Sequence, residues 1–253
     1  MTNFLAFFSL YSLLFFTISQ SQVISTTQYN IINNVPNIPG GARFDQEIGV
    51  PYTLNLMETI NQFIYEIFEQ PGPSDRRPVP ILTVYISDFI DAAGYTNGPN
   101  INISAPVIEN FGPGLEQARW YFNCLMYHEM THIFQWFGSG IEKSTAPGGL
   151  TEGVADYVMI KSGFYDPDAT EKPGSGQRWD EGYGVTAWFL IYCDGLRRGF
   201  TAELNNKMRY SYSDELFVDL LGKSVDELWR DYKAQYKNNN SSENFSSEIG
   251  NRR

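Results

Sequence analysis

The residues with the clearest capacity for chemistry are His128, Glu129 and His132, which form an H-E-x-x-H sequence. On an α-helix, residues i and i+4 lie on one face, so both imidazoles would point the same way and could bind one metal ion. Glu129 would lie about 100° around the helix from His128, at ~3.6 residues per turn, where its carboxylate could act on a metal-bound water. The chain has 2 histidines, and both belong to this motif. The pattern predicts a metal site with a general base beside it.

The segment around the motif has the composition of a buried helix. Residues 115–127 contain no proline or glycine, and their large apolar side chains recur at spacings of three and four. Apolar residues continue to Phe137, after which Gly138 could cap the C-terminus. The Gly-Pro-Gly sequence at 112–114 marks the start. We expect one long helix, from about residue 115 to residue 137.

A catalytic zinc site needs a third protein ligand and an open position for water. Since no third histidine exists, a carboxylate must complete the set. Glu152 and Asp156 are spaced i,i+4 on a second predicted helix, for which Thr151 is the candidate N-cap. Carboxylates on an otherwise apolar helix are costly to bury unless they are paired or bind a metal. We predict that Glu152 is the third ligand and that Asp156 accepts a hydrogen bond from a ligating ring, with His128 favoured. The alternative is a surface pair, or a Glu152 that caps its own helix.

The N-terminal residues 1–21 have the pattern of a secretory signal peptide. Residues 4–18 are predominantly apolar, no charged residue precedes Arg43, and residues 19–21 offer small side chains at a cleavage point. The stretch is short for a membrane span, which needs ~20 apolar residues. We therefore expect a secreted, extracellular protein with no membrane attachment after cleavage. Candidate glycan acceptors are Asn102, Asn239, Asn240 and Asn244.

Charge and cysteine content narrow the partners and the covalent chemistry. The net charge of −11 opposes contact with phosphate backbones, so nucleic acid is excluded as a partner. Cys124 and Cys193 could form one disulfide in an oxidising compartment, or remain buried free thiols. Cys124 shares the helical face of His128, but its spacing matches no metal-binding pattern.

The remaining pattern predicts an α+β fold. Because strands come mainly first and helices later, we expect an N-terminal mixed sheet, then the motif helix, then a mainly helical C-terminal part. Residues 22–236 would form one catalytic domain, followed by a polar, disordered tail at 237–253. Strands are expected at 29–33, 81–86 and 100–108, the last at a sheet edge. Helices are expected at 53–70, 183–196, 214–221 and 225–236.

Several segments in order along the chain carry a recognisable pattern, at residues 39–44, 128–136, 146–158, 178–183 and 220–229. Together they resemble the plant basic secretory protein family, also described as peptidases of plants and bacteria. The resemblance spans roughly residues 25 to 236 and implies a zincin-like, glutamate-ligand (gluzincin) zinc metallopeptidase, secreted to the apoplast or cell wall and linked to plant defence. It also implies His128, His132 and Glu152 as ligands and Glu129 as base. The net charge of −11 departs from the family's "basic" label.

The predicted function is hydrolysis of peptide bonds, in a peptide or protein substrate, by water activated on one Zn²⁺ ion. The tetrahedral oxyanion needs a further donor, for which Tyr183 is the candidate, ahead of Tyr127 and Tyr157. Simple packing is the alternative role for Tyr183. The strand at 100–108 could pair with an extended substrate, an interaction that a glycan on Asn102 would obstruct.

A second reading is a secreted metal-binding defence protein with little or no catalytic turnover. The intact Glu129 argues against it, because a structural metal site needs no general base. A carbohydrate-binding module would use the 15% aromatic content, but no motif supports it.

Overall fold

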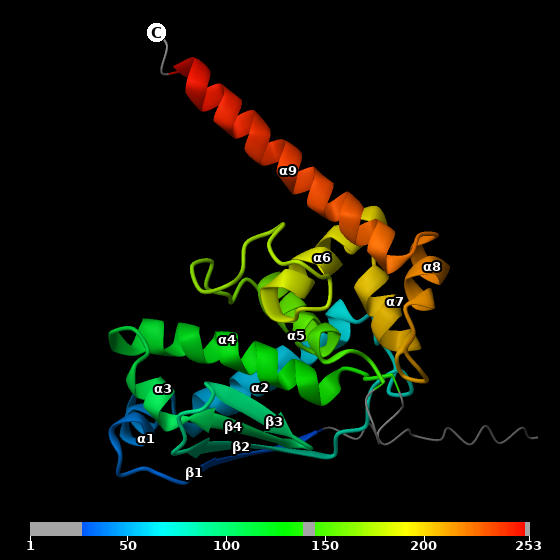
Figure 1. Cartoon of the computed structure of the whole chain (residues 1–253). Helices are drawn as coiled ribbons and strands as arrows, with labels where there is room; N and C mark the ends of the chain where they lie inside the picture. The colour runs from blue at the N-terminus through cyan, green and yellow to red at the C-terminus, as the bar shows by residue number, and fades with distance from the viewer. Residues whose placement is uncertain (1–26, 139–144, 251–253) are drawn as a thin grey trace, which may run out of the picture.

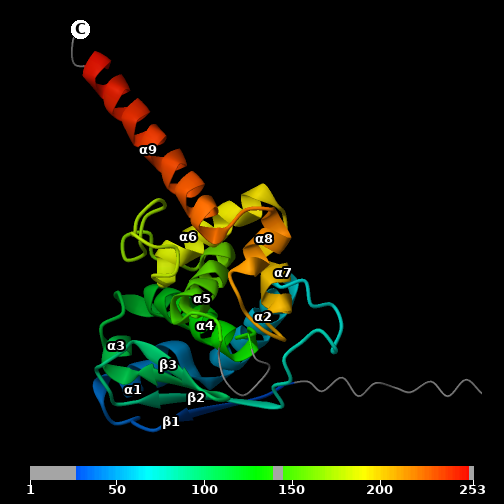
Figure 2. The same ribbon diagram turned by 45° about the vertical axis from the view of Figure 1, so that its right-hand side comes forward.

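The computed structural model describes residues 27–138 and 145–250. A four-stranded sheet forms one side of the molecule, and the helices pack over one of its faces and beyond (Figure 1; Figure 2). The fold is mixed α+β with mostly helical content, as predicted. The predicted signal peptide at 1–21 lies outside the described residues. No helix in the described part of the chain is both long and apolar enough to cross a membrane.

The sheet has the order β1-β2-β4-β3 and is mixed, as predicted. β1 and β2 pair in parallel, as do β2 and β4, whereas β3 runs antiparallel to β4. A parallel pair needs a crossover, and helix α2 (Gly49–Ile67) supplies it between β1 and β2. The strands are β1 (Gln28–Asn33), β2 (Ile81–Ser87), β3 (Gly94–Asn97) and β4 (Asn100–Ser104).

The prediction of an edge strand at 100–108 is wrong in two respects. β4 ends at Ser104, whose hydroxyl accepts a hydrogen bond from the Val107 amide at 3.3 Å and caps helix α3 (Ala105–Glu109). β4 also lies inside the sheet, between β2 and β3. The edge on this side is β3, which the sequence pattern does not reveal.

The core lies between the sheet and the helices. α2 contacts β1, the motif helix α4 contacts β3, and the two helices contact each other. Fully burying one such apolar side chain stabilises the fold by about 1.5–3 kcal/mol. The fully buried apolar residues of this interface include Leu82, Val84, Ile86, Ile101 and Ile103 from the sheet and Met57, Ile60, Ile64, Phe122, Met126 and Met130 from the helices.

The motif helix α4 spans Gly114–Phe134 and therefore ends earlier than residue 137, without using Gly138 as its cap. The backbone turns extended at Gln135 (φ −75, ψ 157), where the side chain bonds to groups on α4 and on helix α5. α5 spans Gly148–Ser162, and its N-cap is Pro147. Thr151 lies inside the first turn and donates to the Pro147 carbonyl at 3.4 Å, so its predicted capping role is wrong.

The C-terminal part is helical. Helix α6 (Tyr183–Leu196) packs closely on α5, and a Cβ added at Gly153 would lie 2.3 Å from Cβ of Thr186. α9 continues to Gly250 and so enters the range 237–253 for which the sequence predicts disorder. The remaining elements are α1 (Pro39–Arg43), a π-helical turn at Phe44–Ile48, α7 (Phe200–Lys207), α8 (Glu215–Leu221) and α9 (Val225–Gly250).

Side chains of α9 bind the loop at residues 174–176, which precedes α6. Lys233 donates to the carbonyls of Gly174, Ser175 and Gly176, and the Tyr232 hydroxyl accepts from the Gly174 amide at 2.7 Å. The loop in turn reaches the start of α6, because a Glu171 carboxylate oxygen accepts from the Gly184 amide at 3.0 Å. The C-terminal helix thereby positions the segment that leads into α6.

Candidate metal centre and active site

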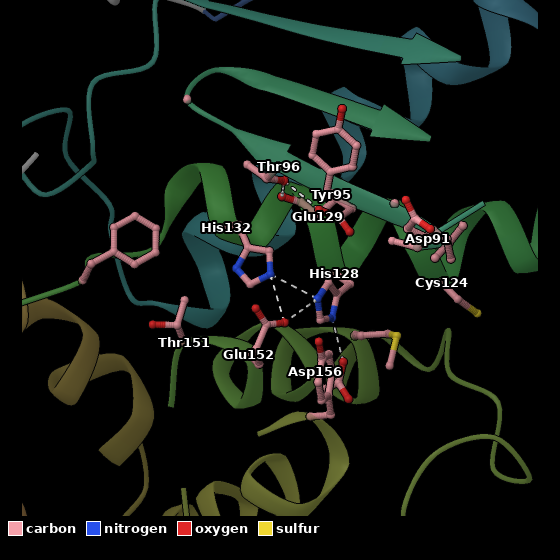
Figure 3. A pocket seen from close by; sticks show the side chains of 18 of the residues that line it. Asp91, Tyr95, Thr96, Cys124, His128, Glu129, His132, Thr151, Glu152 and Asp156 are labelled. Atoms are coloured by element: carbon pink, nitrogen blue, oxygen red, sulfur yellow. Dashed lines mark hydrogen bonds and ion pairs between the residues drawn. The ribbon is translucent and has the colours of Figure 1, made fainter. Parts of the chain in front are cut away.

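His128, His132 and Glu152 converge at the contact between α4 and α5 (Figure 3). The Nε2 atoms of the two histidines are 3.1 Å apart, and Oε2 of Glu152 lies 3.2 Å from Nε2 of His128 and 3.4 Å from Nε2 of His132. One ligand atom from each residue lies within 4.8 Å of the others. The i,i+4 spacing on α4 aligns the two rings, and α5 brings the carboxylate to them. These three residues could hold a metal ion.

Asp156 lies one turn after Glu152 on α5, and its Oδ1 is 2.7 Å from Nδ1 of His128. Its side chain is 8% exposed, so the carboxylate has little access to water. This is the partner and the ring predicted from the sequence. A carboxylate at Nδ1 fixes the ring orientation and directs the other nitrogen, Nε2, toward the centre of the cluster.

Gln135 is a site residue that sequence reasoning missed. Its Nε2 lies 2.8 Å from Nδ1 of His132 and 3.2 Å from the Thr151 carbonyl, so it ties the second histidine to α5. The side chain is fully buried. The available signal was a polar residue three positions after His132, within the apolar run from Ile133 to Phe137.

Glu129 lies beside the edge strand β3, where its Oε2 accepts a hydrogen bond from Oγ1 of Thr96 at 2.7 Å. The residue is buried, at 5% exposure. It lines the same cavity as His128, His132 and Glu152, so a fourth polar group shares one space with the three donors.

Tyr183 lies over the cluster, with its ring stacked on His128 at 6.0 Å between centroids and 14° between planes. It is the first residue of α6 and has φ of +44°, a left-handed conformation that is uncommon for a residue other than glycine. Such strain clusters at functional sites. The negative charge of Glu152, followed by burial, raises the pKa of the Tyr183 hydroxyl and keeps it a donor.

Tyr127 and Tyr157, the weaker candidates, do not line this cavity. The Tyr127 ring is buried and stacks on Phe164 at 5.4 Å between centroids. The Tyr157 hydroxyl donates to the Asp194 carboxylate, which ties α5 to α6. The contacts of Tyr127 and Tyr157 therefore stabilise the packing of the fold and do not place either hydroxyl in the cavity.

The electrostatics of the cluster favour a cation. Burial alone would lower the pKa of His128, but hydrogen bonds to Asp156 and Glu152 outweigh it and raise that pKa. Burial would likewise raise the pKa of Glu152, but its hydrogen bonds with His128 and His132 hold it well below its usual range. Two carboxylates thus face the rings and stabilise positive charge between them.

A cavity of about 860 Å³ opens over the cluster. Arg77 is the one lysine or arginine among the described residues that line it, and its Nη1 donates to the His132 and Ile133 carbonyls at the end of α4. Cys124 also lines the cavity, but it is free, as is the buried Cys193. The two cysteines are therefore unbridged. Apolar and aromatic residues on the wall include Tyr95, Leu125, Phe137 and Met159.

The chain is similar to known proteins over most of its length. A family model described as "Peptidase of plants and bacteria" matches residues 24–232. A segment of 58 residues is 45% identical to "Basic secretory protease" of Boswellia serrata. That match covers 23% of this chain and 66% of the relative, just under two thirds of its length. No solved structure matches the chain. Because the family model covers nearly the whole described body, the chain belongs to the family of peptidases of plants and bacteria.

Proposed function

We propose that the protein is a secreted zinc metallopeptidase of the glutamate-ligand type, which hydrolyses peptide bonds by a metal-activated water. The observation that carries the proposal is the convergence of His128, His132 and Glu152 in the cavity that Glu129 also reaches. Three ligands leave a fourth position for water, which is the arrangement of catalytic rather than structural zinc sites. A zincin-like fold, with the motif helix packed against the sheet, is part of the same proposal.

The spacing of the donors supports zinc. A tetrahedral ion with bonds of ~2.0–2.1 Å separates its ligand atoms by ~3.3–3.4 Å. The observed separations of 3.1, 3.2 and 3.4 Å are close to these values. Two imidazoles and one carboxylate are also a donor set that zinc accepts, and the outward nitrogen of His128 has the carboxylate partner that ligating histidines use.

When bound, Zn²⁺ lowers the pKa of a water toward ~7 and polarises the scissile carbonyl. Glu129 takes the proton of the attacking water and passes it to the leaving amine. Tyr183 donates its hydroxyl proton to the oxyanion in a hydrogen bond, from the rim of the cavity. Asp156 and Gln135 hold the two rings in place throughout.

The substrate binds as an extended strand along β3. β3 is one of the two edge strands of the sheet in the described part of the chain, and its residues Gly94, Tyr95 and Thr96 line the cavity. Edge strands recognise peptides through main-chain hydrogen bonds. The role expected of the strand at 100–108 thus passes to β3, and Asn102, on the inner strand β4, lies off this edge.

The extracellular setting is also part of the proposal. Residues 1–21 have the signal-peptide pattern, and the Boswellia serrata relative is named a secretory protease. We place the protein in the apoplast or cell wall, with a role in plant defence and glycans on its sequons.

The test compares the wild type with Glu129→Gln, and with Glu116→Gln as a control on the exposed first turn of the same helix. The wild type should bind about one zinc per chain and cleave a peptide library, and chelation should stop cleavage. Glu129→Gln should keep the zinc and lose activity by about 10²–10⁴-fold. The Glu116→Gln control should keep both.

Two results would decide against the proposal. Equal cleavage by Glu129→Gln and the wild type would remove the general base from the mechanism. Stoichiometric zinc without any cleavage by the wild type would favour the alternative, a secreted metal-binding defence protein with little turnover.

A further inference from the structure

We infer that Thr96, on the edge strand β3, is the positioning residue for the general base Glu129, so that one strand both receives the substrate and aims the base. The inference rests on the proposed function. It starts from the hydroxyl of Thr96, which lies 2.7 Å from Oε2 of Glu129 and 3.2 Å from the Glu129 carbonyl oxygen (Figure 3). A hydroxyl has one proton, and the shorter contact directs it to the carboxylate.

This hydrogen bond compensates for the burial of the Glu129 carboxylate. Glu129 is 5% exposed, and a buried carboxylate is costly without a hydrogen-bond partner. Among the described residues, Thr96 is the one side chain that donates to it. The bond holds one carboxylate oxygen and leaves Oε1 to receive the proton of the attacking water.

Gly94 provides an independent observation on the second oxygen. A Cβ at this position would lie 3.0 Å from Oε1 of Glu129 and 3.1 Å from Cδ1 of Ile103. Residues 94 and 96 are two apart on a strand and share a face, so each addresses one oxygen of the same carboxylate. Tyr95, between them, points away from the base (Figure 3).

The consequence for catalysis is geometric. A general base has to lie within hydrogen-bond reach of the proton it takes, and a misplacement of about 1 Å can cost ~10²-fold in rate. Without the Thr96 hydroxyl, the Glu129 side chain keeps its chemistry but loses the contact that selects its rotamer. The loss should fall on kcat, because Thr96 contributes its backbone, not its hydroxyl, to the strand edge.

The test uses Thr96→Val, which removes the hydroxyl at nearly constant shape, and Thr96→Ser, which keeps it. Thr59→Val, at an exposed site on α2, is the matched control. Thr96→Val should lower kcat by about 10–100-fold with KM within twofold and zinc content unchanged. Thr96→Ser should recover most of the activity, and Thr59→Val should match the wild type.

Gly94→Ala tests the second oxygen without touching the hydroxyl. It should also lower kcat, since the added methyl presses on Oε1. A readout independent of turnover is the crystal structure of metal-free Thr96→Val, in which the Glu129 carboxylate should occupy a rotamer different from that of the wild type.

The inference is overturned if Thr96→Val keeps the wild-type kcat, or if Thr96→Ser is as slow as Thr96→Val. The first outcome, in an enzyme that Glu129→Gln inactivates, removes the role of Thr96 and leaves the proposed function intact. A wild type that cleaves no peptide rejects the proposed function itself. If Thr96→Val does not fold, Thr96→Ala takes its place, and a wild-type kcat in that variant rejects the inference.

Discussion

The carboxylate of Asp156 lies 2.7 Å from Nδ1 of His128, while Nε2 of the same ring lies 3.2 Å from Glu152. Two acidic residues one helical turn apart therefore hold the two nitrogens of one imidazole. The Nδ1 contact places the ring proton on the Asp156 side and turns the lone pair of Nε2 toward the ligand cluster.

Replacing Asp156 by Asn keeps the shape of this partner and removes its charge. We expect zinc affinity to fall about 10–100-fold, because the ring becomes a weaker and less well-oriented ligand. Competition against a chromophoric chelator measures the change. Asp219→Asn, on the exposed face of α8, serves as control, and equal affinity in both variants would contradict the role of Asp156.

Gln135 fixes the position of the His132 ring, and its effect on the metal site should be visible in the same titration. Gln135→Leu removes the 2.8 Å contact to Nδ1 and the hydrogen bond to the Thr151 carbonyl. Zinc affinity should fall at least about 10-fold. The exposed Gln117→Leu, on the same helix, should leave it unchanged. A Gln135→Leu protein that binds zinc as the wild type does would reduce this residue to packing.

Tyr183→Phe separates catalysis from packing at the rim of the site. The ring and its stacking on His128 are kept, whereas the hydroxyl is lost. We expect kcat to fall about 10²–10³-fold with KM and zinc affinity unchanged, because the donor acts on the transition state. Tyr210→Phe, at an exposed site outside the cavity, is the control. Unchanged kcat in Tyr183→Phe would mean that the oxyanion donor is another group.

The close approach of α5 and α6 predicts a stability effect. A Cβ at Gly153 would lie 2.3 Å from Cβ of Thr186, so Gly153→Ala should destabilise the protein by about 1–3 kcal/mol. Gly148→Ala, exposed in the first turn of α5 with no described atom within 4 Å of the new Cβ, should change stability by at most about 0.5 kcal/mol. Urea denaturation measures both. Similar values for the two variants would contradict the tight contact.

The two free thiols predict that the stability of the fold and the reactivity of the cysteines depend on pH. Burial raises the pKa of Cys124 to about 12 and that of the Cys193 thiol further still, because the thiolate is disfavoured away from water. A raised folded-state pKa gives stability that is present below the unfolded value of ~8.5 and is lost as pH rises toward 12. Iodoacetamide at pH 8 should therefore leave both cysteines unmodified in the folded protein and modify both after denaturation without reductant. Mass spectrometry distinguishes this from a disulfide, which would resist alkylation in both states.

The site residues that lie on helices could be predicted from the sequence. His128, His132, Glu152 and Asp156 were paired by their i,i+4 spacing, and the structure brings these four side chains together. Gln135 could not be predicted because it follows Phe134, the last residue of α4. The direction of its side chain therefore depends on the backbone conformation at the end of the helix. No periodic pattern specifies that turn.

The sheet was predicted less well, for a physical reason. Alternation along residues 100–104 shows which face of the strand is buried, but it does not show which of its two edges is paired. The prediction of an edge strand is therefore wrong for β4, which has a neighbouring strand on each side. β3 is short, begins with Gly94 and alternates between half-buried and exposed residues, so it has too little apolar pattern to predict a strand.

The contacts of Lys233 with the loop at 174–176 have a consequence for the order of synthesis. This lysine is added 57 to 59 residues after the carbonyls that it binds. While the chain is still growing, the loop that leads to Tyr183 lacks its anchor, although the motif helix has long been made. The residues that could cut a peptide bond, from His128 to Glu152, are thus translated well before Lys233, which supports the rim of their cavity.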